Sequence, residues 1–74
     1  MADVSLIGLL NDASSKASSG DLLGALEDYS KATEIDPRSA SAWYGLGVIH
    51  AKRGDSEKAI PAFEKAHDIE PSHG

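Results

Sequence analysis

The second half of the chain repeats the first half at a constant spacing of 34 residues. The pair Gly20-Asp21 returns as Gly54-Asp55, and the small and apolar side chains that follow return in the same order. The further matches are Ala25 with Ala59, Tyr29 with Phe63, Ala32 with Ala66, Ile35 with Ile69, and Pro37 with Pro71. A fixed period of this length indicates a repeat architecture, in which one supersecondary unit is used twice and each copy buries its apolar face against the other.

The second unit has the pattern of two helices that pack on each other. One face of its first helix holds Trp43, Leu46 and Gly47, because the last two follow the tryptophan by three and four residues. The bare backbone at Gly47 lets a second helix approach closely, and a large aromatic ring can lie over it. The facing stripe is small, large and small: Ala59, Phe63 and Ala66. We predict one core from these residues, with the first unit packed alongside through Leu9, Ala25, Leu26 and Tyr29.

Turn signals divide the chain into four predicted helices. Gly54 interrupts the helical pattern of the second unit, and Pro71 ends it because the residue before a proline disfavours the α region. The expected helices span residues 6–19, 22–35, 40–53 and 56–69. Their predicted N-caps are, in order, Ser5 or Asp3, Asp21, Ser39 and Asp55. The chain is therefore predicted to be all-α, with two antiparallel helix-turn-helix hairpins.

These residues resemble the tetratricopeptide repeat family. The family pattern of Trp-x2-Leu-Gly-x2-Tyr, then Ala-x3-Phe, Ala and Pro, is nearly complete in residues 40–73, where His50 replaces the Tyr. Residues 6–39 are a degenerate copy, with Asp12 in place of the Leu and Lys16 in place of the Tyr. The alternative is an unrelated pair of helical hairpins. The resemblance implies that the whole chain, 1–74, is one domain whose hairpins stack as a short right-handed solenoid.

The resemblance also implies a site. In this family the first helices of successive repeats line a concave groove that holds a peptide or a partner helix. The groove-facing candidates are Ile7, Leu10, Ser14 and Ala17 from the first unit, and Ser41, Tyr44, Val48 and Lys52 from the second. Leu10, Tyr44 and Val48 would form an apolar patch with Lys52 as a charge at its edge. The alternative interpretation is that these side chains pack on one another inside the groove.

The sequence contains no constellation that indicates catalysis or metal binding. The chain has no cysteine, which removes disulfides and thiolate metal sites. His50, His67 and His73 do not share the spacing along one helix face that a metal site requires. No base stands near the serine pairs to activate a nucleophile. We therefore expect a non-enzymatic protein with no cofactor and no metal.

The charge distribution and the hydropathy of the chain limit the classes of partner that it can bind. Residues 1–37 hold seven acids and two bases, whereas residues 38–74 hold five of each. An acidic half beside a neutral half disfavours nucleic acid, which requires phosphate neutralisation by Lys and Arg, and it argues against a helix-turn-helix DNA binder. No run of about 18 apolar residues exists, so no membrane span is expected. The absence of cysteine and of a basic leader favours a cytoplasmic protein.

Two function classes remain after these exclusions. The first is a protein-protein interaction module that presents its groove to a peptide or partner helix. The second is a structural module whose main partner is another copy of itself. We take the first as the expected function and keep the second as the alternative.

We predict that the chain self-associates, most simply as a two-fold dimer. Two repeats bury little apolar surface at this size, and Ile60 and Ile69 have no obvious cover. Light scattering across a dilution series tests the prediction. A fully stable monomer at micromolar concentration would contradict it.

Overall fold

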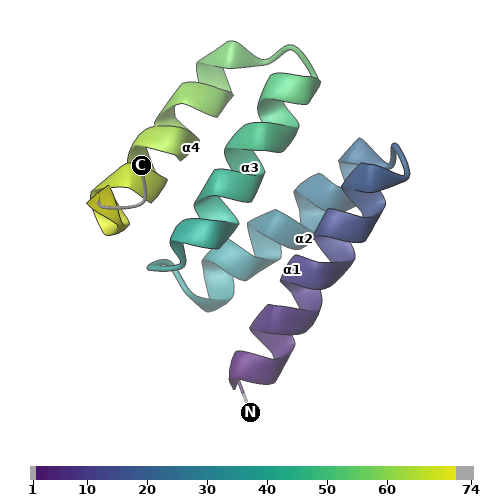
Figure 1. The fold of residues 1–74 in the computed structure, drawn as a ribbon, viewed down its shortest axis with the longest axis vertical. Helices are drawn as coiled ribbons and strands as arrows, with labels where there is room; N and C mark the ends of the chain where they lie inside the picture. The colour runs from purple at the N-terminus through teal and green to yellow at the C-terminus, as the bar shows by residue number, and fades with distance from the viewer. Residues whose placement is uncertain (1, 72–74) are drawn as a thin grey trace.

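The computed structural model describes residues 2–71. Four helices follow one another along the chain: α1 Ala2–Ser18, α2 Leu22–Ile35, α3 Ala40–Lys52 and α4 Ser56–Ile69 (Figure 1). α1 packs against α2, α3 packs against α4, and α2 joins the two pairs by packing on α3. No strand occurs within residues 2–71. The predicted all-α architecture of stacked helical hairpins is confirmed, while residues 72 and 73 of the predicted second repeat lie outside the described part of the chain.

The predicted helix bounds hold best where a turn signal stands at both ends. α2 and α4 span the predicted residues, and α3 ends one residue early, at Lys52. α1 begins at Ala2, before the predicted start, because no glycine or proline in residues 2–5 stops the helix. Asp3 and Ser5 therefore lie inside α1, and the prediction that one of them caps it is wrong.

Two of the other three predicted caps are confirmed as side-chain caps. The Asp21 carboxylate accepts a hydrogen bond from the backbone N–H of Gly24 at 3.0 Å. The Ser39 hydroxyl accepts one from the N–H of Ala42 at 3.2 Å. Each bond satisfies a donor that the first turn of a helix leaves unpaired. Asp55 occupies the N-cap position of α4, but its side chain makes no cap hydrogen bond, so that prediction holds for position only.

Both hairpins turn through the same glycine-based motif. Gly20 and Gly54 have φ values of 93° and 78°, a region that only glycine enters freely. The N–H of the residue after each glycine donates to the carbonyl five residues earlier, at 2.8 Å in both hairpins. This pattern satisfies the last carbonyls of the first helix and turns the chain back on itself. The Gly-Asp repeat in the sequence therefore encodes two equivalent turns.

The core is built mainly from alanine. The buried apolar residues are Ala13, Ala25, Ala32, Ala42, Ile49, Ala59, Ala62 and Ala66. Ile49 is the largest fully buried side chain, 1% exposed, and it packs where α3 meets the first hairpin beside Ala13 and Ala25. The predicted core did not include Ile49. Small residues at so many contact positions let the helix backbones lie close together.

The large residues of the predicted core lie nearer the surface than expected. Trp43, Leu46 and Phe63 are half-buried, so the prediction of one core from six residues holds for its small members Gly47, Ala59 and Ala66, which are buried, and not for its large ones. The Trp43 indole is held at the edge because its Nε1–H donates to the backbone carbonyl of Pro37 at 2.9 Å. That bond ties α3 to the turn before it. Phe63 lies directly over Gly47, as the sequence predicted.

An ion pair ties α1 to α2. Lys16 Nζ donates a hydrogen bond to Asp28 Oδ2 at 2.9 Å. Asp28 is buried, whereas the Lys16 side chain is partly exposed. The bond to Asp28 raises the pKa of Lys16 above its usual 10.5.

Replacing Gly47 with leucine should lower the free energy of unfolding by about 1–3 kcal/mol through overpacking. A Cβ added at Gly47 would lie 2.8 Å from Phe63 Cδ1, so the ring has to move. Gly8→Leu is the matched control, because Gly8 is an exposed helical position with no heavy atom within 4 Å of an added Cβ. Urea unfolding should show a loss for Gly47→Leu only. An equal effect in both variants would contradict close helix contact at Gly47.

The Lys16–Asp28 pair should stabilise the fold only below strongly alkaline pH. Because the folded-state pKa of Lys16 is raised, the contribution is complete below 10.5 and is lost as pH rises through the folded-state value. Burial also raises the pKa of Tyr29, so alkaline pH affects the chain in a second way. Urea unfolding of the parent chain and of Lys16→Met on both sides of 10.5 isolates the pair. The stability gap between the two chains should close at the higher pH; a constant gap would refute the assignment.

Candidate functional site

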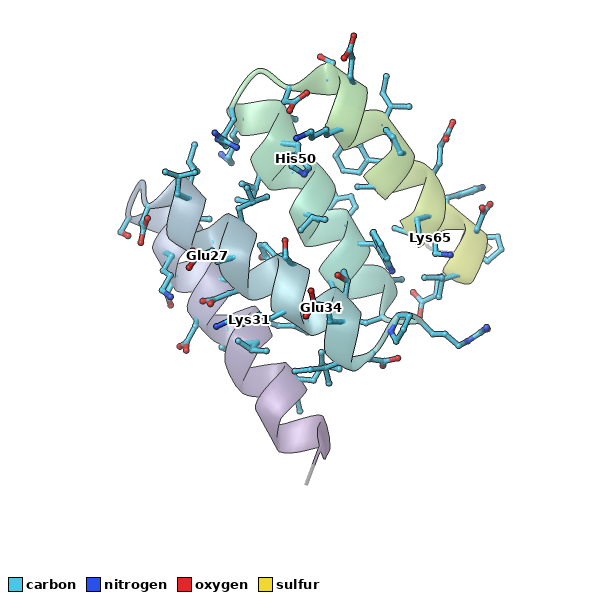
Figure 2. All side chains as sticks on the ribbon, turned by 180° about the vertical axis from the view of Figure 1, so that it is seen from behind. Glu27, Lys31, Glu34, His50 and Lys65 are labelled. Atoms are coloured by element: carbon cyan, nitrogen blue, oxygen red, sulfur yellow. The ribbon has the colours of Figure 1, made fainter. Side chains whose placement is uncertain are left out.

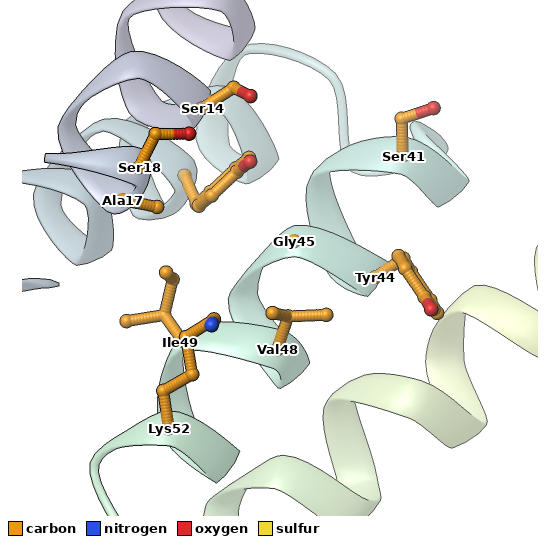
Figure 3. Close-up of a pocket in the computed structure, with 10 residues that line it drawn as sticks. Ser14, Ala17, Ser18, Ser41, Tyr44, Gly45, Val48, Ile49 and Lys52 are labelled. Carbon is orange, nitrogen blue, oxygen red and sulfur yellow. The ribbon is translucent and has the colours of Figure 1, made fainter. Parts of the chain in front are cut away.

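A cleft of about 360 Å³ opens between α1 and α3, with α2 contributing to its lining. Its lining residues are Ser14, Ala17, Ser18, Tyr29, Ser41, Tyr44, Gly45, Val48, Ile49 and Lys52. α1 touches α3 only lightly, so the space between them is not closed by packing (Figure 3). Three serine hydroxyls, two tyrosines and an apolar strip therefore face one hollow.

Most of the groove candidates chosen from the sequence come together in this cleft. Ser14, Tyr44, Val48 and Lys52 line it, as do the further candidates Ala17 and Ser41. Whether any of them contacts a partner stays a prediction.

Ile7 and Leu10 do not line the cleft. They lie on α1 nearer its N-terminus, with Ile7 57% exposed and Leu10 half-buried. Figure 1 shows the first turns of α1 extending past the start of α3. The predicted apolar patch therefore lacks Leu10 within the cleft.

Four lining residues were not among the candidates, and Tyr29 is the most important of them. It comes from α2, and its ring lies against Gly45, where any side chain would collide with it. Ile49 and Ser18 complete the set. The sequence signal that could have found Tyr29 is the glycine at position 45 within a helix, since an unexplained helical glycine indicates close approach by a neighbour.

Tyr44 serves both of the roles between which the sequence did not decide. Its side chain is 50% exposed and lines the cleft. Its ring also packs against that of Phe63, with centroids 5.4 Å apart and an interplanar angle of 55°. A tilted aromatic pair of this kind stabilises its own geometry, so Tyr44 is held in place while half of it stays accessible.

Lys52 supplies the one charge among the residues that line the cleft. Figure 3 shows its side chain running back along α3, with the ammonium directed into the hollow. Within the described residues the ion pair is that of Lys16 with Asp28, so the Lys52 ammonium has no carboxylate partner there. The cleft is therefore weakly cationic at one end.

The described residues hold no group of three or more His, Cys, Asp or Glu side chains that could bind a metal ion. His50 and His67 lie on different helices, and His73 lies outside the described residues. No helix within residues 2–71 is long and apolar enough to cross a membrane.

The chain folds as two stacked hairpins whose Gly-Asp turns repeat every 34 residues, and its sequence matches two family profiles. The profile described as "TPR repeat" matches residues 14–54, and that described as "Tetratricopeptide repeat" matches residues 40–73. The chain belongs to the tetratricopeptide repeat family. Members of this family are typically non-catalytic modules that bind other proteins. The resemblance found in the sequence is thereby confirmed.

Several curated proteins are similar to this tetratricopeptide repeat chain. It is 34% identical over 59 residues to a tetratricopeptide repeat protein 36 homolog of Nematostella vectensis, covering 80% of this chain and 33% of the relative. It is 35% identical over 63 residues to the photosystem I assembly protein Ycf3 of Rippkaea orientalis, covering 81% of this chain and 36% of the relative. Anaphase-promoting complex subunit 3 of Schizosaccharomyces pombe is 36% identical over 45 residues, which cover 61% of this chain and 7% of that protein. The chain thus spans about a third of the length of the first two relatives.

Proposed function

We propose that this tetratricopeptide repeat chain is a non-catalytic interaction module that binds a peptide or a partner helix in the cleft between α1 and α3. The observation that carries the proposal is Tyr44, a large aromatic side chain fixed by Phe63 on one side and accessible in the cleft on the other. Tyrosine is favoured as a binding anchor because it presents a large area and a polar tip while losing little conformational freedom.

The rest of the lining suits a polypeptide ligand. Ala17 and Val48 offer apolar contact to a ligand side chain. The hydroxyls of Ser14 and Ser41 can hydrogen bond to either the N–H or the C=O groups of a ligand backbone, because a hydroxyl both donates and accepts. Beyond the cleft, the exposed side chain of Ile7 extends the apolar surface along α1.

The relatives support an interaction role in general terms. Their names place one in photosystem I assembly and make another a subunit of the anaphase-promoting complex. Their identities do not transfer a partner to this chain. We propose only that the partner is a protein segment, with no nucleic acid involved, and that the chain acts in the cytoplasm.

Self-association is the second candidate function, and Ile60 favours it. Ile60 is 57% exposed on α4, so an apolar side chain is uncovered at the end of the second hairpin. Another copy of the chain could cover it, and the dilution experiment given above tests this.

Tyr44→Ala should weaken binding of peptides selected on the parent chain by about 1–2 kcal/mol or more. The peptides are selected from a random library on immobilised parent chain, and affinity is measured by titration calorimetry. Circular dichroism and thermal melting of the same variant show whether loss of the Phe63 contact has unfolded it. If folded Tyr44→Ala binds the selected peptides as tightly as the parent chain, the cleft is not the site.

Lys52→Ala separates the contribution of charge from that of contact area. The substitution should mainly slow association and make the association rate less dependent on salt. A charge at the edge of a site affects the association rate more than the dissociation rate. Lys31→Ala is the matched control, since Lys31 is exposed on α2 and does not line the cleft.

A further inference from the structure

A second hollow, of about 500 Å³, lies between α3 and α4. We call it the His50 groove; its lining residues are Trp43, Leu46, His50, Glu57, Lys58, Pro61, Ala62 and Lys65. Figure 2 shows His50 and Lys65 on the face of the molecule opposite to the view of Figure 1. We propose that the His50 groove binds a partner protein by taking an Asp or Glu side chain of that partner between α3 and α4. The proposal does not depend on the cleft between α1 and α3.

Among the buried side chains of residues 2–71, His50 holds the polar atom that has no hydrogen-bond partner. The residue is 9% exposed, and its Nδ1 atom is buried with no hydrogen-bond partner among the described residues. Buried polar atoms in folded proteins are nearly always paired, so an unpaired imidazole nitrogen at a groove indicates a missing group. Nδ1 itself is shielded, and pairing requires the ring to turn about its Cβ–Cγ bond toward the incoming oxygen.

The first hairpin shows which group is missing. At the repeat spacing of 34, His50 corresponds to Lys16 and Ala62 corresponds to Asp28. In the first hairpin Lys16 and Asp28 meet at 2.9 Å, which places a carboxylate between the two helices. In the second hairpin, the position that corresponds to Asp28 is occupied by Ala62, whose methyl group is buried. A carboxylate supplied by a partner would therefore restore, at His50, the arrangement that the first hairpin contains within itself.

The charges around the groove suit that ligand. Lys58 and Lys65 outnumber Glu57 among its lining residues, so the groove carries net positive charge. The Lys65 ammonium lies 5.9 Å from the centroid of the Trp43 ring, which holds it over the groove. The apolar surfaces of Trp43, Leu46 and Pro61 offer contact to the neighbours of the acidic residue, and this favours a protein segment over a free carboxylate ion.

The test uses two short amphipathic helical peptides, free of tryptophan, that differ only in a central Glu or Gln. Trp43 is the single tryptophan of the chain and lines the groove, so its fluorescence reports binding directly. The Glu peptide should give a saturable change and bind at least about tenfold more tightly than the Gln peptide. Equal binding of the two, or no saturable change with either, overturns the proposal. Sodium acetate is titrated as a third ligand. If acetate alone reproduces the fluorescence change, the groove is a site for small anions, and the proposal that it binds a protein segment is overturned.

Two variants locate the contact. His50→Phe keeps a ring of similar size and should abolish the preference for Glu over Gln, whereas the control Lys31→Ala, at an exposed position that lines neither hollow, should retain it. Ala62→Asp supplies the carboxylate from within the chain and should weaken binding of the Glu peptide at least about tenfold. Ala62→Asp also keeps the test decisive if His50→Phe does not fold. A Glu preference that survives in folded His50→Phe or folded Ala62→Asp, or that is lost in Lys31→Ala, places the acid elsewhere and refutes the proposal.

Discussion

The arrangement of α2, α3 and α4 depends on aromatic rings that lie over bare backbone. Tyr29 of α2 lies against Gly45 of α3, and Phe63 of α4 lies against Gly47, also of α3. Two glycines that are two residues apart lie on different faces of one helix, so aromatic rings contact α3 on two of its faces. The first contact joins the hairpins to each other, and the second closes the second hairpin. Because neither position tolerates a Cβ without movement, the spacing of the helices is set at these two points.

The cleft follows from the same contacts. With Tyr29 seated on Gly45, α2 fills the space beneath α1 and α3, and those two helices need not meet closely. Ile49 seals the bottom of this space against Ala13 and Ala25. The hollow that remains is bordered by rigid helices, so its side chains are positioned by the fold instead of by a flexible loop. Tyr44 adds to this rigidity because its ring is held by Phe63.

Features that local signals encode, such as helix caps, can be predicted from the sequence. Features that depend on how far one helix is shifted along its axis relative to another cannot. Asp21 and Ser39 are recognisable caps because the cap acts within one turn. Ile7 and Leu10 share the correct face of α1, yet they miss the cleft because α1 is displaced along its axis relative to α3 (Figure 1). Periodicity specifies a face and not an axial shift. Trp43 is predicted in the core because it shares a helix face with Leu46 and Gly47, but its indole N–H requires an acceptor, and the carbonyl of Pro37 provides one at the edge.

The internal repeat separates structural residues from residues that are free to serve a function. Positions that keep their character at the spacing of 34 are those that set geometry, such as the turn glycines and the rings of Tyr29 and Phe63. The positions that change form a second group; it includes Gly45 and Gly47, which set geometry although their counterparts are Asn11 and Ala13, and it also includes residues that make no such ring contact. His50 and Ala62 belong to this second group, and so does Tyr44, whose counterpart is Leu10. The His50 groove and the cleft between α1 and α3 are both lined mainly by such divergent residues, so binding chemistry can vary there while the shared scaffold stays fixed.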